Sequence, residues 1–215
     1  MFERVADERL VVHDGRLGRL ARELRDFAGM IVSGSASSLA TGAVGASPEP
    51  WQDDAADLVV RAHDLGVPVL GVCYGHQLIG YAFGARVVVN PKGYEIGTRA
   101  VELTDAGSAD PLFAGLPSRI RTNLTHFDVV VEAPARIRPL AKNDMTELQA
   151  IAVGEHVRGV QFHPEFDGAI MRAYVDARRA EVRDHDPDVL RAEAADCPEA
   201  EHIVRNFRVH FVGRS

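Results

Sequence analysis

An apolar run that leads into a cysteine between two glycines constrains the fold of this chain more than any other feature. The run covers residues 67–72, reads Val-Pro-Val-Leu-Gly-Val, and is followed by Cys73, Tyr74 and Gly75. A continuous apolar run is typical of a strand that is covered on both faces of a parallel sheet. Gly71 and Gly75 lack a Cβ, so they leave room for a sharp bend. The sequence therefore predicts a strand, a tight turn at Cys73 and a helix after it.

The predicted turn gives Cys73 the position of a nucleophile. A thiol between a strand and a helix is exposed at the end of the sheet, and the N–H groups that open the helix favour its thiolate form. The alternative interpretation is a buried structural cysteine, which is common in protein cores. Glycine on both sides of the bend favours the nucleophile, because packing alone rarely requires both glycines.

A tripeptide far along the chain supplies the base that a nucleophilic cysteine needs. His163, Pro164 and Glu165 follow the segment 157–162. His163 can withdraw the thiol proton and later give it to a leaving amine, provided that Glu165 holds its other ring nitrogen. Proline stiffens the link, so both side chains can point the same way at the end of a strand. The tripeptide alone also fits an ordinary loop histidine, but its pairing with Cys73 favours catalysis.

Strand-like and helix-like segments alternate along the first half of the chain. Apolar residues at helical spacing separate the strand-like segments, namely Leu17, Leu20, Ala21 and Leu24, then Ala55, Leu58, Val59, Ala62 and Leu65. This order predicts an α/β fold with an open, mostly parallel central sheet flanked by helices. Between residues 86 and 162 the β-forming residues predict an antiparallel β extension. The predicted strands cover residues 9–13, 29–33, 67–72, 86–89, 99–103, 128–132 and 149–153.

Length and composition fit one compact domain over residues 1–215. A chain of 215 residues with 46% hydrophobic residues can bury a substantial core, which we expect at about residues 9–180. A highly charged segment follows, and within 181–215 the apolar residues recur at near-helical spacing, at Ile203, Val204, Phe207 and Phe211. This spacing predicts a C-terminal helix that covers the domain's own core, with partner binding as the alternative.

Charge and cysteine content exclude several classes of protein. The net charge of −7 and the lack of Lys/Arg-rich runs give no reason to expect a nucleic-acid partner. The chain has no secretory signal and no run of about 18 apolar residues, so we expect no membrane association and a cytoplasmic location. Cys73 and Cys197 are the two cysteines. They predict neither a disulfide framework nor a zinc site, and we expect no metal or other cofactor.

The two motifs together resemble those of the class I glutamine amidotransferases. Their glutaminase domains carry a Cys-x-Gly-His-Gln turn, which is Cys73 to Gln77 here, and a distal His-Pro-Glu. The resemblance runs from about Gly29 to Arg179 and is greatest to stand-alone proteins similar to the glutaminase part of guanosine monophosphate synthetase. It also includes Ile31–Ser38, Pro50-Trp51, Gly93–Gly97, Thr125–Asp128 and Gly159–Phe166. It implies a flavodoxin-like α/β fold and attack by cysteine on the side-chain amide of glutamine, which releases ammonia and leaves a γ-glutamyl thioester for hydrolysis to glutamate.

Residue by residue, the resemblance implies three catalytic side chains. Cys73 is the nucleophile, His163 is the general base and acid, and Glu165 orients His163. The tetrahedral intermediate carries a negative oxygen, which backbone N–H groups typically stabilise.

The resemblance assigns these oxyanion-hole N–H groups to Tyr74 and Ser35. Many relatives read Gly-Gly-Pro where this chain reads Gly34-Ser35-Ala36, so the loop is less constrained by its sequence here.

Four further residues match substrate-contacting positions of the family. Gln77 lies one helical turn after Cys73 and Gly34 lies in the oxyanion loop, while His126 and Asp128 form a His-x-Asp element near the glutamine pocket. In isolation, Gln77 reads as an ordinary first-turn polar residue and His126 as a hydrogen-bonded scaffold residue. Glu95 has a similar status and is not assigned a role.

The resemblance leaves three functions open. The first is a glutaminase that uses glutamine and acts alone or with a separate synthetase or acceptor subunit, because the residues outside the core are too few for a second domain. The second is a γ-glutamyl peptidase or hydrolase, and the third is a non-catalytic regulatory or binding subunit. Compared with the family, the chain starts within the first helix, around Phe2 to Val5, and the usual first strand has no counterpart. The resemblance therefore leaves the number of strands open, and another segment can take the place of the first strand.

Overall fold

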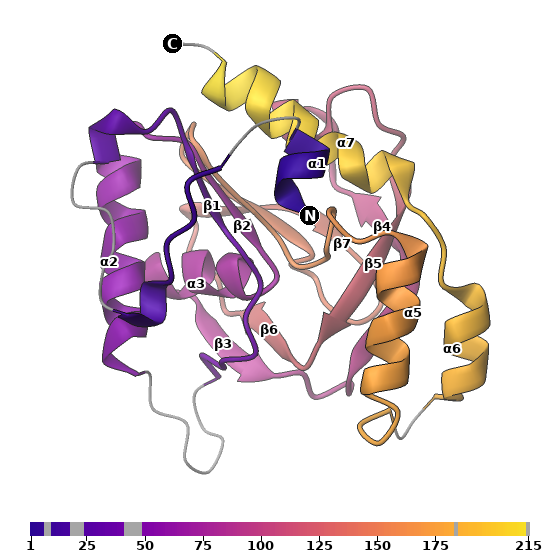
Figure 1. The fold of residues 1–215 in the computed structure, drawn as a ribbon. Coiled ribbons are helices and arrows are strands. Elements are labelled where there is room, and N and C mark those ends of the chain that lie inside the picture. The colour runs from indigo at the N-terminus through magenta and orange to yellow at the C-terminus, as the bar shows by residue number, and fades with distance from the viewer. Residues whose placement is uncertain (7–9, 18–23, 41–48, 183–184, 214–215) are drawn as a thin grey trace.

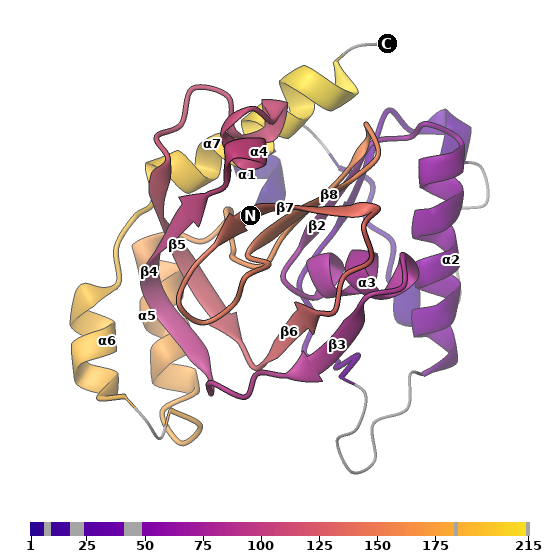
Figure 2. The ribbon, with the colours of Figure 1, turned by 180° about the vertical axis from the view of Figure 1, so that it is seen from behind.

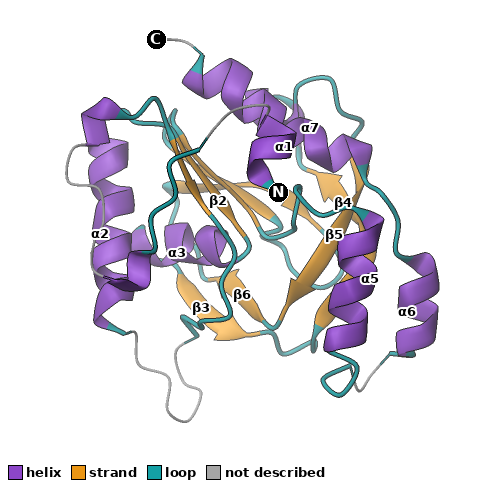
Figure 3. Cartoon of the chain, viewed as in Figure 1, coloured by secondary structure: helices purple, strands orange, loops and turns teal. Residues whose placement is uncertain are grey.

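A seven-stranded sheet forms the centre of the protein (Figures 1 and 3). The computed structural model describes residues 1–6, 10–17, 24–40, 49–182 and 185–213. In their order across the sheet, the strands are β1 (Met30–Val32), β2 (Val69–Val72), β9 (Val157–Val160), β8 (Ala150–Val153), β7 (Ile137–Lys142), β4 (Glu95–Leu103) and β5 (Arg119–His126). A separate two-stranded sheet pairs β3 (Arg86–Val89) with β6 (Asp128–Val131).

The strand directions confirm the predicted α/β class, with its mostly parallel sheet and antiparallel extension. β1, β2 and β9 pair in parallel, and β8, β7, β4 and β5 continue the sheet through antiparallel pairs. Among the described strands of this sheet, only β8 and β4 run against the rest, so five of the seven point the same way. The extension curls round towards the last helices of the chain (Figure 2).

Helices cover both faces of the sheet. α2 (Pro50–Asp64) and α3 (Tyr74–Ala82) pack on one face, and α1 (Phe2–Ala6) and α7 (Pro198–Phe207) pack on the other. The other helical segments are α4 (Asp105–Ser108), α5 (Gly168–Ala177), α6 (Pro187–Glu193), three 3₁₀ turns at Gly15–Leu17, Leu24–Asp26 and Pro111–Phe113, and a π-helical turn at Arg208–Val212. None of the helices within the described ranges has the length and apolar character needed to cross a bilayer.

Strand β2 shows why the sequence has a continuous apolar run before Cys73. Successive strand residues point to opposite faces, so Val69 joins the core beneath α2 and α3, whereas Leu70 and Val72 join the core beneath α7. All three side chains are fully buried. A strand with a core on each face needs apolar residues at consecutive positions rather than at alternate ones.

The strand predicted over residues 9–13 is wrong for residues 10–13. These residues are irregular, and Val11 and Val12 are 70% and 86% exposed. A cavity separates them from β1, which stands at the edge of the described sheet. Without a neighbouring strand to pair with, their β-forming side chains do not produce a strand. Residue 9 and most of the helix predicted between Leu17 and Leu24 lie outside the described residues.

The other predicted strands are present, with some shift in their ends. Segments 29–33, 67–72, 86–89, 128–132 and 149–153 contain β1, β2, β3, β6 and β8, and 99–103 is the second half of β4. The predictions omitted β5 and β7. β5 buries the polar residues Thr122, Asn123 and Thr125, so it lacks an apolar pattern. β7 contains Pro139 at a register shift, and proline in a sequence argues against a strand.

The predicted C-terminal helix is α7. Its residues Ile203, Val204 and Phe207 are buried in the core beneath it. This contact favours the interpretation in which the helix covers the domain's own core.

A buried ion pair joins β9 to Asp110, the residue before the 3₁₀ turn at Pro111–Phe113. Arg158 of β9 and Asp110 are 3% and 1% exposed at their side chains, and Nε of Arg158 lies 3.0 Å from both carboxylate oxygens of Asp110. The guanidinium of Arg158 also lies 4.9 Å from the ring centre of Phe211. Buried charges of this kind are costly when one partner is removed.

We therefore expect Asp110→Asn to lower the free energy of unfolding by roughly 3 kcal/mol, since it leaves the Arg158 charge buried without a carboxylate. The asparagine side chain keeps the hydrogen bond from the Leu112 N–H that Asp110 now accepts. Urea denaturation followed by circular dichroism measures the change. Arg138→Ala is the matched control, because Arg138 contacts the same carboxylate from a side chain that is 52% exposed, and its loss should cost less than about 1 kcal/mol. Equal losses in the two variants would contradict this reading of the pair.

Candidate active site

Cys73 occupies a strained turn between β2 and α3, as the sequence predicts. Its backbone has φ 53° and ψ −104°, a region that residues with a side chain rarely adopt. Its N–H donates to the carbonyl of Val160 (2.9 Å), and its carbonyl accepts from the N–H of Gln77 (3.1 Å). The turn is therefore fixed on one side by β9 and on the other by the first turn of α3. Strained conformations that are held in this way are concentrated at functional sites.

Two glycines allow α3 to approach the sheet closely enough to force this turn. A Cβ at Gly75 would lie 2.1 Å from the carbonyl oxygen of Val32 in β1. A Cβ at Gly71 would lie 2.4 Å from the carbonyl oxygen of Gly75. Neither position can hold a larger residue without moving backbone atoms, which explains the glycine on each side of Cys73.

His163 and Glu165 form a direct hydrogen bond. Nδ1 of His163 lies 2.8 Å from Oε1 of Glu165, and both side chains are buried. The His163 ring also stacks on Phe166, with 4.0 Å between ring centres and 17° between planes. Asn123 of β5 holds this segment from two points, because its carbonyl accepts from the His163 N–H (2.8 Å) and its Nδ2 donates to the Phe166 carbonyl (3.0 Å).

Cys73, His163 and Gly34 meet at one point. A Cβ at Gly34 would lie 3.0 Å from Cε1 of His163 and 3.7 Å from the Cβ of Cys73. Burial lowers the pKa of His163, but the charges of Cys73 and Glu165, with hydrogen bonds to both, outweigh burial and raise that pKa to about 10. The three side chains predicted to be catalytic are thus brought together, although they come from two distant parts of the sequence.

The two residues predicted to line an oxyanion hole are the neighbours of Cys73 and Gly34 in the sequence. Tyr74 directly follows Cys73 and opens α3. Ser35 directly follows Gly34, is exposed, and accepts a hydrogen bond at Oγ from the Ser37 N–H (3.1 Å). The positions of Tyr74 and Ser35 fit the predicted roles of their N–H groups.

Gln77 is buried and its amide N–H groups are already engaged. Nε2 donates to the Asp128 carbonyl (3.0 Å) and to Oε1 of Gln161 (3.3 Å). Gln77 therefore ties α3 to β6 and to the segment that follows β9. Its predicted contact with substrate stays a prediction.

His126 lies in a buried polar cluster that includes Glu95 and Gln149. Its Nδ1 lies 3.1 Å from the Asp128 carbonyl, and its Nε2 lies 3.0 Å from Oε2 of Glu95. Glu95 also accepts from Asn143 (2.5 Å) and Gln149 (2.8 Å). These contacts favour the scaffold interpretation of His126, and its predicted contact with substrate stays a prediction.

Asp128 connects this cluster to the loop that contains Gly34. Its Oδ2 accepts from the hydroxyl of Ser38 (2.5 Å). Burial raises the pKa of Asp128. The side chain therefore has a structural partner, while contact with substrate is a prediction for it as well. Sequence analysis missed Ser38, because a serine in a serine-rich loop carries no signal of a distant partner.

His76 is the buried neutral member of the cysteine turn. Burial lowers its pKa to about 3. A Cβ at Gly159 would lie 2.9 Å from Nδ1 of His76, so glycine in β9 makes room for the ring. His76 thus packs α3 against the sheet and does not contribute a charge near neutral pH.

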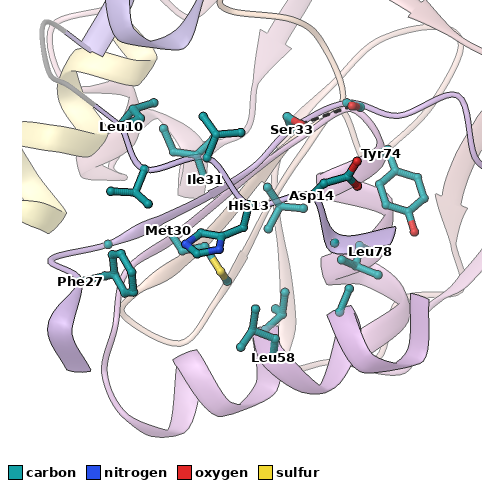
Figure 4. A pocket seen from close by; sticks show the side chains of 18 of the residues that line it. Leu10, His13, Asp14, Phe27, Met30, Ile31, Ser33, Leu58, Tyr74 and Leu78 are labelled. Carbon is teal, nitrogen blue, oxygen red and sulfur yellow. Dashed lines mark hydrogen bonds between the residues drawn. The ribbon is translucent and has the colours of Figure 1, made fainter. Parts of the chain in front are cut away.

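A cavity of about 850 Å³ lies beside Tyr74 of the cysteine turn (Figure 4). Cys73 is not among the residues that line it. Its lining is largely apolar and includes Leu10, Ile31, Leu58 and Leu78. It reaches the proposed catalytic region at Ser33, Gly34, Ser35 and Tyr74. The cavity therefore lies against the back of the oxyanion loop, and the nucleophile itself is 7% exposed.

The strain at Cys73 predicts that glycine stabilises this position relative to alanine. We expect Cys73→Gly to exceed Cys73→Ala in free energy of unfolding by about 1 kcal/mol, because relief of a positive φ gains roughly 1–3 kcal/mol and glycine loses roughly 0.5–1 kcal/mol of chain entropy. Guanidinium denaturation of both variants measures the difference. A more stable alanine variant would show that the turn is not strained.

His76 predicts a pH dependence of stability. Its folded pKa of about 3 lies below its ordinary value of 6.5, so below pH 6.5 the unfolded chain binds a proton that the folded protein excludes. The free energy of unfolding should therefore fall as the pH drops from 6.5 towards 3, by up to about 1.4 kcal/mol per pH unit for this group.

Thermal or urea denaturation between pH 7 and pH 4.5 should show a shallower fall in His76→Met, which cannot take up the proton. His202→Gln is the control, because His202 is exposed on α7. Parallel curves for the wild type and His76→Met would exclude His76 as the source of the dependence.

Comparisons with known proteins identify the family. The sequence model of the family described as Glutamine amidotransferase class-I matches residues 15–175. A GMP synthase [glutamine-hydrolyzing] of Aeropyrum pernix is 37% identical over 152 residues, which are 69% of this chain and 26% of that protein. The chain thus spans about a quarter of the length of that relative.

Two further proteins extend the comparison. Gamma-glutamyl peptidase 5 of Arabidopsis thaliana is 28% identical over 157 residues, which are 72% of this chain and 60% of that protein. A glutamine amidotransferase of Thermotoga maritima has the same fold, with a TM-score of 0.77 and 23% identity over 99% of this chain and 90% of that one. With the family model covering most of its length, this chain belongs to the class I glutamine amidotransferase family.

Proposed function

We propose that this protein hydrolyses the side-chain amide of glutamine through a γ-glutamyl thioester on Cys73. The observation that carries the proposal is the position of His163. Its Nδ1 is held by Glu165, and its ring lies close enough to Cys73 for charge and hydrogen-bond interactions with the thiol. Cysteine, histidine and an orienting carboxylate are the parts that covalent acyl transfer by a thiol requires. The family match supports the same chemistry.

The raised pKa of His163 supports a protonated ring beside Cys73, whose thiolate form is the nucleophile. At about 10, this pKa leaves the ring protonated at neutral pH, with Cys73 and Glu165 as the causes that oppose burial. The thiolate can then attack the amide carbon directly. His163 supplies its proton to the nitrogen as the C–N bond breaks, so ammonia leaves and the thioester remains.

Hydrolysis of the thioester returns the enzyme to its starting state. A water molecule gives a proton to the neutral His163 as its oxygen attacks the thioester carbon. The C–S bond then breaks, which releases glutamate and restores the thiolate beside the imidazolium. Each tetrahedral intermediate carries a negative oxygen, and we assign its stabilisation to the N–H groups of Tyr74 and Ser35. One such donor is typically worth about 10²–10³ in kcat.

The ammonia that this reaction releases needs an acceptor, which a partner protein would supply. The matched GMP synthase [glutamine-hydrolyzing] of Aeropyrum pernix is about four times as long as the matched segment. We therefore propose that a synthetase or acceptor partner uses the ammonia. The chemistry also needs a reduced Cys73, which supports the expected cytoplasmic location.

A second candidate function is hydrolysis of γ-glutamyl peptides or conjugates. Thr125 lies between Cys73 and an aromatic pair, because its carbonyl is 3.9 Å from Sγ of Cys73 and its hydroxyl is 2.7 Å from that of Tyr94. Tyr94 stacks on Phe127 with ring centres 3.9 Å apart, and Phe127 is 39% exposed. An exposed aromatic surface near the nucleophile suits a substrate with an apolar group beyond its glutamyl part. The similarity to Gamma-glutamyl peptidase 5 also supports this candidate.

Turnover assays separate these functions. Purified protein is incubated with glutamine and, separately, with γ-glutamyl dipeptides and γ-glutamyl anilides, and the release of ammonia, glutamate and amine is measured. We expect glutamine turnover that Cys73→Ala abolishes. Release from γ-glutamyl conjugates alone would replace the first candidate by the second, and no release from any substrate would favour a regulatory or binding subunit.

Cys197→Ala is the matched control for the loss of a thiol. Burial raises the pKa of Cys197 to about 11, and its Sγ lies 3.6 Å from the Ala195 carbonyl. We expect this variant to keep the wild-type rate within about twofold, since a buried neutral thiol is a poor nucleophile. Equal loss in both cysteine variants would contradict the assignment of Cys73.

A further inference from the structure

Gln52 in the first turn of α2 uses every hydrogen-bonding atom of its side chain. It is 1% exposed. Its Nε2 donates to the Ser38 carbonyl (3.1 Å) and to the hydroxyl of Tyr74 (3.0 Å), and its Oε1 accepts from the Glu49 N–H (2.6 Å). The bond to Glu49 caps the helix. The other two bonds are not needed for capping and lead to different elements.

These two bonds join the two parts of the proposed oxyanion hole. Ser38 belongs to the loop after β1 that contains Gly34 and Ser35. Tyr74 directly follows Cys73, and its N–H is the other proposed donor. One amide group therefore fixes the distance between a loop and a helix whose N–H groups must point at the same oxygen.

A second contact holds the loop from the opposite side. The Ser38 hydroxyl donates to Asp128 (2.5 Å) and accepts from the Ala40 N–H (3.1 Å). The carbonyl of Ser38 is held by Gln52 and its side chain by β6, so this residue cannot shift without breaking both contacts. The ring of Tyr74 is fixed in turn by Trp51, at 5.8 Å between ring centres.

A cavity borders the part of the loop that holds the proposed N–H donor. Ser33, Gly34 and Ser35 line that cavity, as does Tyr74 (Figure 4). Packed side chains normally fix a loop, but a cavity offers no atoms to pack against. Leu39 and Ala40 anchor the far end of the loop by packing, whereas the part that contains Gly34 and Ser35 faces the cavity. Through the Ser38 carbonyl and the Tyr74 hydroxyl, Gln52 connects the loop to the nucleophile turn.

We propose that Gln52 is a positioning residue that keeps the N–H groups of Ser35 and Tyr74 at the separation the oxyanion requires. This inference rests on the proposed function. Gln52 does not touch the reacting atoms. Its loss should weaken stabilisation of the transition state and leave both substrate binding and the thiolate intact.

Gln52→Met tests the proposal, because methionine has a similar length and no hydrogen-bonding amide. We expect kcat for glutamine to fall by about 10- to 100-fold with KM within about threefold, which is the pattern of an interaction made only in the transition state. The rate at which iodoacetamide alkylates Cys73 should stay within about twofold of wild type, because alkylation at a saturated carbon forms no oxyanion.

Two further variants make the test independent of folding defects. Tyr74→Phe removes only the hydroxyl that Gln52 binds and should reduce kcat in the same direction by a smaller factor. Tyr81→Phe is the matched control, because the Tyr81 hydroxyl also joins α3 to α2, through Asp53 (2.8 Å), but lies two turns further along α3. It should leave kcat unchanged.

An unchanged kcat in Gln52→Met would overturn the inference, as would a fall in alkylation that matches the fall in kcat, since that would indicate damage to the nucleophile. Wild-type protein that turns over neither glutamine nor any γ-glutamyl compound would instead overturn the proposed function, and this inference with it. The wild-type and variant assays therefore separate the two failures.

Discussion

The close approach of α3 to the sheet is the constraint on which the rest of the site depends. Gly75 lies against the carbonyl of Val32, and Gly71 lies against Gly75, so backbone meets backbone with no side chain between them. The chain can then pass from β2 into α3 only through a turn with positive φ at Cys73. That turn holds Cys73 at the end of the sheet, where it is 7% exposed and borders the core beneath α7.

Polar contacts, rather than apolar packing, place the groups around this turn. His163 is fixed through its backbone by Asn123 and through its ring by Glu165. On the other side, Gln77 and His126 reach the backbone of Asp128, whose carboxylate holds Ser38. Hydrogen bonds are directional, so such a network fixes orientations that close-packed aliphatic side chains leave free. A catalytic site needs that precision more than it needs stability.

Sequence analysis predicted the parts of the site that are short motifs and missed the contacts between distant segments. The Cys73 turn and the His163–Glu165 pair are short motifs with a fixed geometry, and both are present. Asn123 and Gln52 gave no signal, because an asparagine in a strand and a glutamine in a helix gain their roles only when distant segments fold together. Polar residues buried in β5 also hid that strand, since a pattern based on hydrophobicity assumes that buried residues are apolar. Conversely, the β-forming residues 10–13 gave a strand signal without a neighbour to satisfy it.

The pairing of β2 with β9 fixes the position of Cys73 relative to His163. Val72 stands opposite Val160, one residue before Cys73 and three before His163. A deletion of one residue in this stretch would shift the imidazole relative to Cys73 and break the bond between the His163 N–H and the Asn123 carbonyl. The site therefore does not tolerate a change of length between residues 160 and 163. A change of substrate preference has to come from the loops around the site instead.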